Sequence, residues 1–248
     1  MDVLAALRGP GRRSVFDRPP FVSAVREPAV PSPRPPLLVL LHGVGADEFD
    51  LLPVADALDP RLLTVSLRAP YEAEPMGYGW YALDWRTTPP TPRLDQAEAS
   101  RAALAAYLPA LVASAGGDPG RVFLFGFSQG AAMALAVALT RPELLRGAVV
   151  HSARVLPFLE QPERRAAPEA LARLEALVLH GTDDDVIPVA AGREVRALLA
   201  PLLGARLTYR EHEAGHFVTA ETARDGAAWI QARLGPESTA AARSGTGR

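Results

Sequence analysis

Apolar runs of strand length alternate along this chain with segments in which apolar residues recur at helical spacing. Residues 37–41 are five consecutive apolar residues, a pattern typical of a strand buried on both faces of a sheet. The pattern predicts strands at 37–41, 62–67, 121–127, 147–150, 174–179 and 206–211, and helices at 47–58, 94–115, 131–140, 189–203 and 219–234. Such alternation predicts a mostly parallel sheet with helices on both faces, and ligands at the carboxyl ends of its strands.

The two ends of the chain differ in composition from the middle. Residues 1–36 are rich in proline and arginine, with one possible edge strand at 21–26, and we expect a loosely ordered lead-in. Residues 37–234 are expected to form a single domain, which suits a chain of 248 residues that is 48% hydrophobic. Residues 235–248 are small and polar, so we expect a disordered tail.

Charge and composition narrow the possible functions. The formal net charge is −2 and the isoelectric point is near 6.2, so the chain has no basic field to attract nucleic acid or an anionic membrane. Cysteine is absent, which excludes disulfides, thiolate nucleophiles and cysteine-based zinc sites. The sequence shows no long apolar signal-peptide core and no run long enough to span a bilayer, so we expect a soluble, cytoplasmic protein.

One short motif joins the predicted central strand to an alanine-rich helix. It reads Gly126-Phe127-Ser128-Gln129-Gly130, and this Gly-x-Ser-x-Gly pattern places Ser128 on a sharp strand-to-helix turn with its hydroxyl exposed. The amides after the serine open a helix whose positive dipole end favours a developing oxyanion. The motif therefore predicts a serine nucleophile.

A serine nucleophile needs an imidazole to accept its proton. We expect this base to be His216, in a turn after the last strand and before the last helix, with His212 as its rival. His42 and His180 each precede a glycine at a strand's end, which favours a role in shaping turns. His151 closes a strand near the site.

A carboxylate must orient that imidazole, and the candidates are Asp183, Asp184 and Asp185, in a loop between a strand and a helix. Their spacing does not choose among them. The chain order serine, aspartate, histidine is that of α/β-hydrolases.

A tetrahedral intermediate also needs hydrogen-bond donors for its oxyanion. The backbone amide of Gln129, just past the nucleophile, is the first predicted donor, and the amide of Val44, in the turn after His42, is the second.

With these residues, the chain resembles the phospholipase/carboxylesterase family of α/β-hydrolases, which includes the acyl-protein thioesterases and small bacterial carboxylesterases. The matching segments are 41–47 (LHGVGAD), 68–70 (RAP), 126–133 (GFSQGAAM), 180–188 (HGTDDDVIP) and 215–216 (GH). The resemblance implies an α/β-hydrolase fold. It also implies that Ser128 is the nucleophile, Asp184 the acid, His216 the base, and the amides of Val44 and Gln129 the oxyanion hole.

The chain departs from the family pattern at two places. Ser152-Ala153 stands where the family usually has Ser-Gly, so residues 154–157 are expected to line the acyl site differently. The connection 71–92 is long and aromatic, and we interpret it as a wall of the substrate site, with an aromatic-anchored surface loop as the alternative. The residues expected to form an apolar acyl-binding cleft are Tyr78, Trp80, Tyr81 and Leu156.

The sequence thus predicts a serine hydrolase that cleaves carboxylic esters or thioesters of apolar acyl groups through an acyl-enzyme, with no cofactor and no metal. Its expected partners are a small-molecule substrate and, as a possibility, a second copy of the chain. The alternatives are a lysophospholipase or acyl-protein thioesterase with the same triad, and a non-catalytic ligand-binding homologue.

Overall fold

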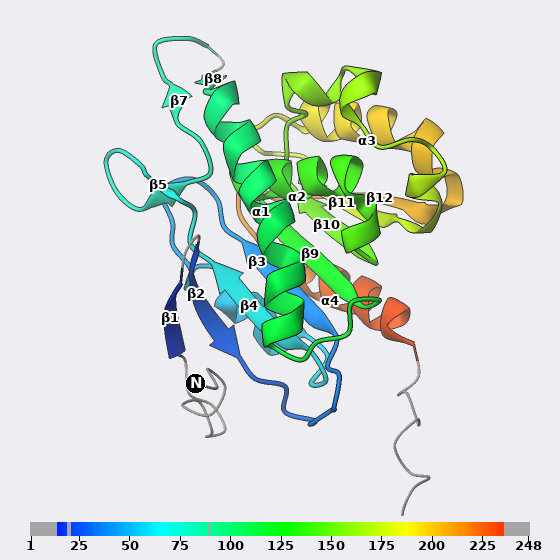
Figure 1. Cartoon of the computed structure of the whole chain (residues 1–248). Helices are drawn as coiled ribbons and strands as arrows, with labels where there is room; N and C mark the ends of the chain where they lie inside the picture. The colour runs from blue at the N-terminus through cyan, green and yellow to red at the C-terminus, as the bar shows by residue number, and fades with distance from the viewer. Residues whose placement is uncertain (1–13, 19–20, 89, 236–248) are drawn as a thin grey trace, which may run out of the picture.

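A mostly parallel eight-stranded sheet forms the centre of the molecule (Figure 1). The computed structural model describes residues 14–18, 21–88 and 90–235. The strand order is β1-β2-β4-β3-β9-β10-β11-β12. Neighbours from β4 to β12 are parallel, whereas β1 and β2, and β2 and β4, pair antiparallel. The strands are β1 (Ser14–Arg18), β2 (Phe21–Arg26), β3 (Leu37–Leu41), β4 (Leu63–Leu67), β9 (Val122–Phe127), β10 (Gly147–His151), β11 (Glu175–Gly181) and β12 (Leu207–His212).

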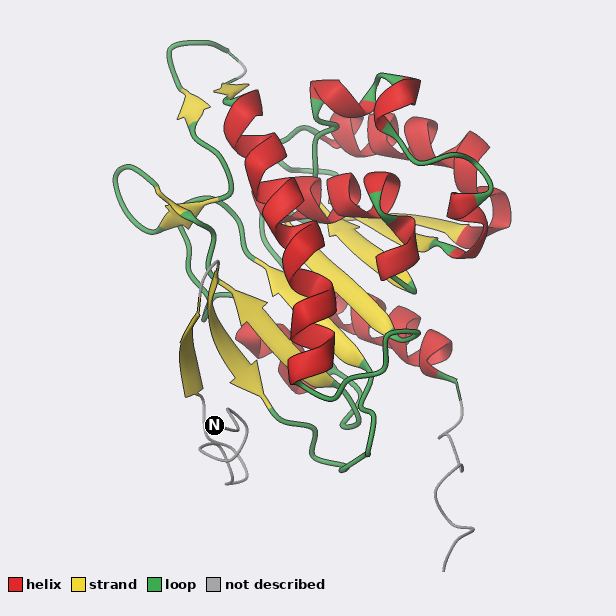
Figure 2. Ribbon diagram, viewed as in Figure 1, coloured by secondary structure: helices red, strands yellow, loops and turns green. Residues whose placement is uncertain are grey.

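Helices cover both faces of this sheet (Figure 2). The α-helices are α1 (Leu94–Ser114), α2 (Gln129–Thr140), α3 (Val189–Leu203) and α4 (Ala220–Leu234). Side chains of each central strand alternate between two apolar clusters: in β3, Leu37, Val39 and Leu41 face one cluster, and Leu38 and Leu40 face the other. Residues of α1, α2 and α3 contribute to the first cluster and residues of α4 to the second. The prediction of an α/β fold with helices on both faces is confirmed.

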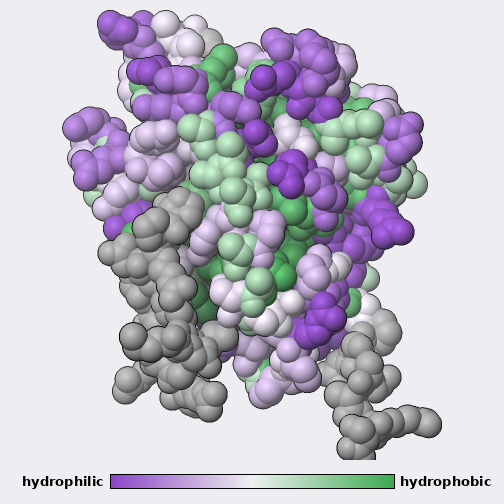
Figure 3. All heavy atoms as spheres, viewed as in Figure 1, coloured by the Kyte–Doolittle hydropathy of each residue, from purple (hydrophilic) through white to green (hydrophobic). Residues whose placement is uncertain are grey.

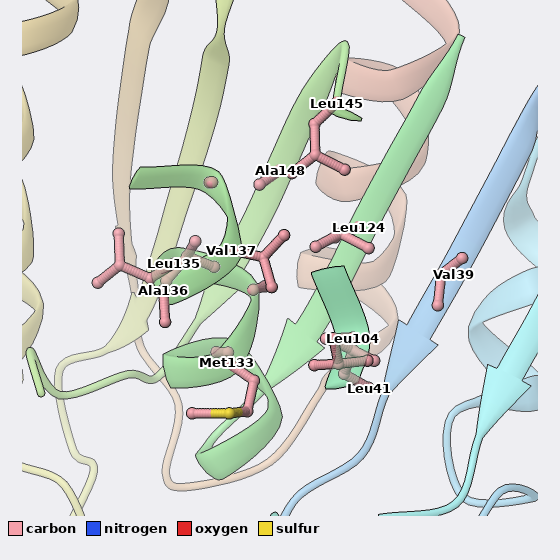
Figure 4. Close-up of a cluster of buried hydrophobic side chains, with 14 of the residues drawn as sticks. Val39, Leu41, Leu104, Leu124, Met133, Leu135, Ala136, Val137, Leu145 and Ala148 are labelled. Atoms are coloured by element: carbon pink, nitrogen blue, oxygen red, sulfur yellow. The ribbon is translucent and has the colours of Figure 1, made fainter. Parts of the chain in front are cut away.

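Helix α2 is enclosed on every side, which explains why its sequence is almost uniformly apolar. All of its residues except the last are buried. Figure 4 shows Met133, Leu135 and Val137 of α2 in one cluster with Leu124 of β9. This helix begins directly after Ser128, so a rigid, fully packed element follows the expected nucleophile.

Two predicted elements differ from the structure. The segment expected to be a helix at 47–58 is a turn followed by a short 3₁₀ helix, η2 (Leu52–Ala57). Pro53 has no amide hydrogen for the i to i−4 bond that an α-helix needs at that position. The segment 21–26 is a strand, as predicted, but it is not at the edge, because β1 pairs with its outer side.

The connection 71–92 contains two small antiparallel ladders. They join β5 (Tyr71–Glu72) to β6 (Tyr78–Gly79), and β7 (Leu83–Asp84) to β8 (Thr91–Pro92). In the predicted lead-in, residues 1–13 and 19–20 lie outside the described residues, as do residues 236–248 of the predicted tail.

Hydrophilic side chains gather on the outer loops, and apolar ones show between the helices in Figure 3. Within the described ranges, none of the helices is long and apolar enough to cross a bilayer.

Two glycines allow the strand and the helix around Ser128 to pack closely. A Cβ at Gly130 would overlap the carbonyl oxygen of Leu41, and one at Gly126 would overlap the carbonyl oxygen of Gly130. Both clashes are with backbone, which cannot move aside as a side chain can.

We therefore predict that Gly130→Ala lowers the free energy of unfolding by about 3 kcal/mol or more, because overpacking against fixed backbone is costly. Urea denaturation measures this. The matched control is Gly117→Ala, whose added Cβ would lie 3.6 Å from the nearest atom, the carbonyl oxygen of Pro35. Equal losses in the two variants would contradict the close-packing argument.

Candidate active site

Ser128 lies in the turn between β9 and α2 with a strained backbone. Its φ is 54° and its ψ is −117°, a conformation that residues other than glycine rarely adopt. The amide of Ser128 donates to the carbonyl of His151 at the end of β10, at 2.9 Å, and fixes the turn to the neighbouring strand. The hydroxyl is thereby directed out of the sheet at the carboxyl ends of the strands.

Ser128, His216 and Asp184 form an unbroken hydrogen-bonded chain. The Nε2 atom of His216 lies 2.9 Å from Ser128 Oγ, and its Nδ1 atom lies 2.8 Å from Asp184 Oδ2. Because an ionised carboxylate only accepts hydrogen bonds, Nδ1 must carry the proton, which leaves Nε2 free to accept one from the serine. The arrangement can therefore draw a proton from the hydroxyl.

Of the three adjacent aspartates, Asp184 alone reaches His216, whereas Asp183 and Asp185 are exposed. Asp184 is buried, and its Oδ1 accepts hydrogen bonds from the amides of Val186 at 3.1 Å and Ile187 at 2.7 Å. Burial raises the pKa of Asp184, but the hydrogen bonds outweigh burial and hold that pKa below its usual value. The carboxylate thus stays ionised and faces the imidazole.

The other predicted histidines hold the surrounding turns. The Nδ1 atom of His42 donates to the Gly43 carbonyl at 2.7 Å, and its Nε2 atom accepts from the Ala69 amide at 3.0 Å. His180 donates from Nε2 to the Ile187 carbonyl at 2.8 Å. His212 lies between Glu221 and Asp225, at 3.4 and 3.3 Å, and is not the histidine next to Ser128.

The turn after β3 lies against Ser128, because a Cβ at Gly43 would be 3.3 Å from the Cβ of Ser128. Among the described residues, neither the amide of Val44 nor that of Gln129 donates a hydrogen bond. Gly45 in this turn has a φ of 87°, a conformation that favours glycine. The turn and the start of α2 thus present two free N–H groups beside the hydroxyl.

Ser152 is a buried member of this site to which the sequence pattern assigned no role. It follows β10, whose last residue, His151, pairs with Phe127 of β9, so Ser152 lies beside Ser128. Its φ is also 54°, and these two serines are the non-glycine residues with positive φ in the described part of the chain. Its hydroxyl contributes to holding the pKa of Asp184 below its usual value, and its Oγ lies 3.2 Å from His151 Nδ1.

The family model described as Phospholipase/Carboxylesterase matches residues 23–232. The chain belongs to the phospholipase/carboxylesterase family. A probable carboxylesterase of Oryza sativa subsp. japonica is 33% identical over 122 residues, which are 49% of this chain and 51% of that protein. A probable inactive carboxylesterase of the same plant is 37% identical over 81 residues, 33% of this chain and 32% of that protein. The chain thus spans about half the length, or less, of the curated relatives that it matches.

Among solved structures, the crystal structure of esterase PE8 has a TM-score of 0.72 with this chain at 29% identity, and the match covers 85% of this chain and 97% of that one. The fold of this family member is accordingly an α/β-hydrolase fold.

Three residues expected to line an acyl cleft in this phospholipase/carboxylesterase family member are buried in the core instead. Trp80 is 0% exposed, Tyr81 6% and Leu156 2%, so their surfaces are occupied by protein atoms. The indole of Trp80 donates to the His42 carbonyl at 2.9 Å, behind the turn that carries Val44. Aromatic residues in a connection can anchor a loop to the core as well as form a wall of a site, and here Trp80 and Tyr81 anchor the loop.

The remaining candidate, Tyr78, is half-buried and packs under a buried ion pair. The guanidinium of Arg68 lies 4.5 Å from its ring centroid and makes two hydrogen bonds to Glu48, at 2.6 and 2.7 Å. The large apolar side chains that are exposed on the connection 71–92 and on the loops of Asp184 and His216 are Met76, Trp85, Val186 and Phe217.

His151 makes the stability of the protein depend on pH. Burial, followed by the nearby imidazoles of His180 and His216, lowers the pKa of His151 to about 3. Unfolded histidine titrates near pH 6.5, so between these values only the unfolded chain binds the proton.

We predict that this residue lowers the free energy of unfolding by about 1.4 kcal/mol per pH unit as the pH falls below about 6. In His151→Asn, whose side chain can keep a hydrogen bond to Ser152, the free energy of unfolding should fall less steeply as the pH is lowered. Urea denaturation of both proteins from about pH 7 to about pH 4.5 measures the two slopes. Parallel slopes would show that His151 does not titrate in this way.

Proposed function

We propose that this chain is a serine hydrolase that cleaves carboxylic esters or thioesters through an acyl-enzyme on Ser128. The observation that carries the proposal is the unbroken chain from Ser128 Oγ through His216 to Asp184, with distances of 2.9 and 2.8 Å. Membership of a family described as phospholipases and carboxylesterases supports ester hydrolysis as the reaction.

In the first half-reaction, Ser128 Oγ attacks the carbonyl carbon while its proton moves to Nε2 of His216. The carbonyl oxygen becomes an oxyanion that accepts hydrogen bonds from the Val44 and Gln129 amides, the two free donors beside the hydroxyl. Collapse of the tetrahedral intermediate breaks the bond to the leaving alcohol or thiol. That group takes the proton from His216, and the acyl group stays on Ser128.

In the second half-reaction, water attacks the acyl-enzyme and gives its proton to His216. The carboxylic acid leaves as Ser128 recovers its hydrogen. Asp184 stays ionised throughout and stabilises the imidazolium, a role that suits a carboxylate whose pKa is held low. No step draws on a group from outside these residues other than substrate and water.

We propose a small-molecule substrate with an apolar acyl group. Support comes from the exposed side chains of Phe217, next to His216, and Val186, two residues after Asp184. Lysophospholipids and acylated proteins carry the same bond and are the alternatives. A cytoplasmic location, a possible homodimer and the lack of nucleic-acid binding stay predictions.

A non-catalytic ligand-binding protein is the second candidate, because one matching relative is named a probable inactive carboxylesterase. A fluorophosphonate probe separates the two functions, since it labels only an activated serine. We predict labelling of the native protein at Ser128 and turnover of p-nitrophenyl esters. Folded protein that neither reacts with the probe nor turns over these esters would favour the second candidate.

Ser128→Ala should abolish labelling and lower kcat by roughly 10⁴-fold or more, because the acyl-enzyme can no longer form. Ser114→Ala is a matched control: Ser114 is exposed at the end of α1, and its loss should leave both readouts unchanged. A Ser128→Ala protein that keeps most of its activity would rule out the proposed nucleophile.

The two aspartates next to Asp184 serve as controls for its assignment as the acid. Asp184→Asn should lower kcat by about 10⁴-fold, because the amide cannot hold the required tautomer of His216 or stabilise its charged form. Asp183→Asn and Asp185→Asn change exposed neighbours in the same loop and should each leave kcat within about threefold of the native value. Steady-state kinetics on one p-nitrophenyl ester compares the three. A larger loss in either neighbour than in Asp184→Asn would move the acid to that residue.

A further inference from the structure

The side chain of Gln129 makes two short hydrogen bonds to a segment far away in the sequence. Its Oε1 accepts from the amide of Trp80 at 2.6 Å, and its Nε2 donates to the carbonyl of Tyr81, also at 2.6 Å. Gln129 is only 4% exposed. A backbone amide must donate and a carbonyl must accept, so the two partners fix the orientation of the carboxamide.

The segment held by this carboxamide is the one that holds the turn of Val44. The amide of Gly45 donates to the Tyr78 carbonyl at 2.9 Å, and the amide of Tyr78 donates to the Ala46 carbonyl at 2.8 Å. The indole of Trp80 adds a hydrogen bond to the His42 carbonyl at 2.9 Å. Residues 78–80 therefore hydrogen-bond to the turn on both sides of Val44, at His42 before it and at Gly45 and Ala46 after it.

A further contact between Gln129 and the turn of Val44 passes through Gly79. A Cβ at this position would lie 3.1 Å from Oε1 of Gln129 and 3.3 Å from Cγ2 of Val44. Gly79 is thus packed between the carboxamide of Gln129 and the side chain of Val44. A movement of the carboxamide would be passed on to Val44 through a single residue.

We propose that the Gln129 side chain is a positioning residue that fixes the Val44 amide relative to the Gln129 amide. The inference rests on the proposed function, in which these two amides bind the oxyanion. One residue then supplies the first donor from its backbone and holds the second donor in place with its side chain, through Trp80, Tyr81 and Gly79.

The proposal predicts a loss in kcat with little change in KM. A misplaced oxyanion donor weakens binding of the transition state, whereas binding of the uncharged substrate carbonyl is largely kept. Complete loss of one donor costs about 10²- to 10³-fold in kcat, so displacement of one should cost about 10- to 100-fold.

The test compares two variants of Gln129. Gln129→Met loses both hydrogen bonds. Gln129→Glu keeps an acceptor for the Trp80 amide but sets an oxygen against the Tyr81 carbonyl. Gln96→Met is the matched control, because Gln96 on α1 accepts from the amide of Ala82 at 2.7 Å and holds the same connection outside residues 78–81. Both Gln129 variants should lose about 10- to 100-fold in kcat with KM within about threefold, and the control should lose little.

Amide hydrogen exchange on the same proteins gives a readout that does not depend on activity. The amides of Gly45, Tyr78 and Trp80 should exchange faster in both Gln129 variants than in the native protein or in Gln96→Met. The exchange of core strands such as β9 should be unchanged in all of them, which shows that the variants are folded.

Two results would overturn the proposal: unchanged kcat in a folded Gln129→Met protein, and a rise in KM with kcat kept, which would make Gln129 a substrate-binding residue. A native protein that hydrolyses no ester would instead defeat the proposed function. In that case the exchange measurement would still decide whether Gln129 holds the turn, since unchanged exchange at Gly45 would refute it.

Discussion

The site depends on one backbone contact, the close approach of the start of α2 to the end of β3. Gly130 lies so near the carbonyl of Leu41 that no side chain fits between them, and Gly126 lies equally close to the first turn of the helix. This contact brings the amide of Gln129 alongside the turn that carries Val44. The turn after β3 and the start of α2, which are distant in sequence, thus meet beside Ser128.

The contact also explains how a strained serine persists. A positive φ costs a non-glycine residue about 1 to 3 kcal/mol, and such a residue keeps it only where the surroundings leave no alternative. Ser128 is held by a hydrogen bond to His151 on one side and by the completely packed helix α2 on the other. Ser152 has the same φ at the end of the adjacent strand, where its Oγ lies 3.2 Å from His151 Nδ1. Two neighbouring strands are thus each followed by a serine with a strained backbone.

Much of the fold could be predicted from the sequence, because continuous apolar strands and helical periodicity are local properties. The strand before Ser128 and the helix after it lie where the pattern placed them, with their bounds shifted by one or two residues. The choice of Asp184 was not a local property. Three adjacent aspartates have the same chemistry, and only the path of the loop, which buries one and exposes two, separates them. Resemblance to the family supplied that choice where spacing could not.

Two further features of the structure could not be predicted from the sequence, because they depend on contacts between distant segments. The position of Ser152 beside Ser128 depends on the register of β10 against β9, which a single sequence does not contain. The burial of Trp80 is the second feature, because composition does not say which side of a loop is buried. An aromatic residue that anchors a connection and one that lines a pocket look identical in sequence.

The burial of Trp80 and Tyr81 restricts which side chains of the connection 71–92 a substrate of the proposed function could contact. Because residues 78–80 on the inner side of this connection are hydrogen-bonded to the turn after β3, the side chains left for a substrate are those at its outer turns and at the loops of Asp184 and His216. Val186 and Phe217 lie within two residues of Asp184 and His216, so changes there risk moving the catalytic groups. Met76 and Trp85 lie on the two small hairpins, outside residues 78–81, and are well exposed. Substitutions in the hairpins therefore disturb Asp184 and His216 less than substitutions in those two loops, and under the proposed function we infer that the hairpins contribute to the choice of acyl group.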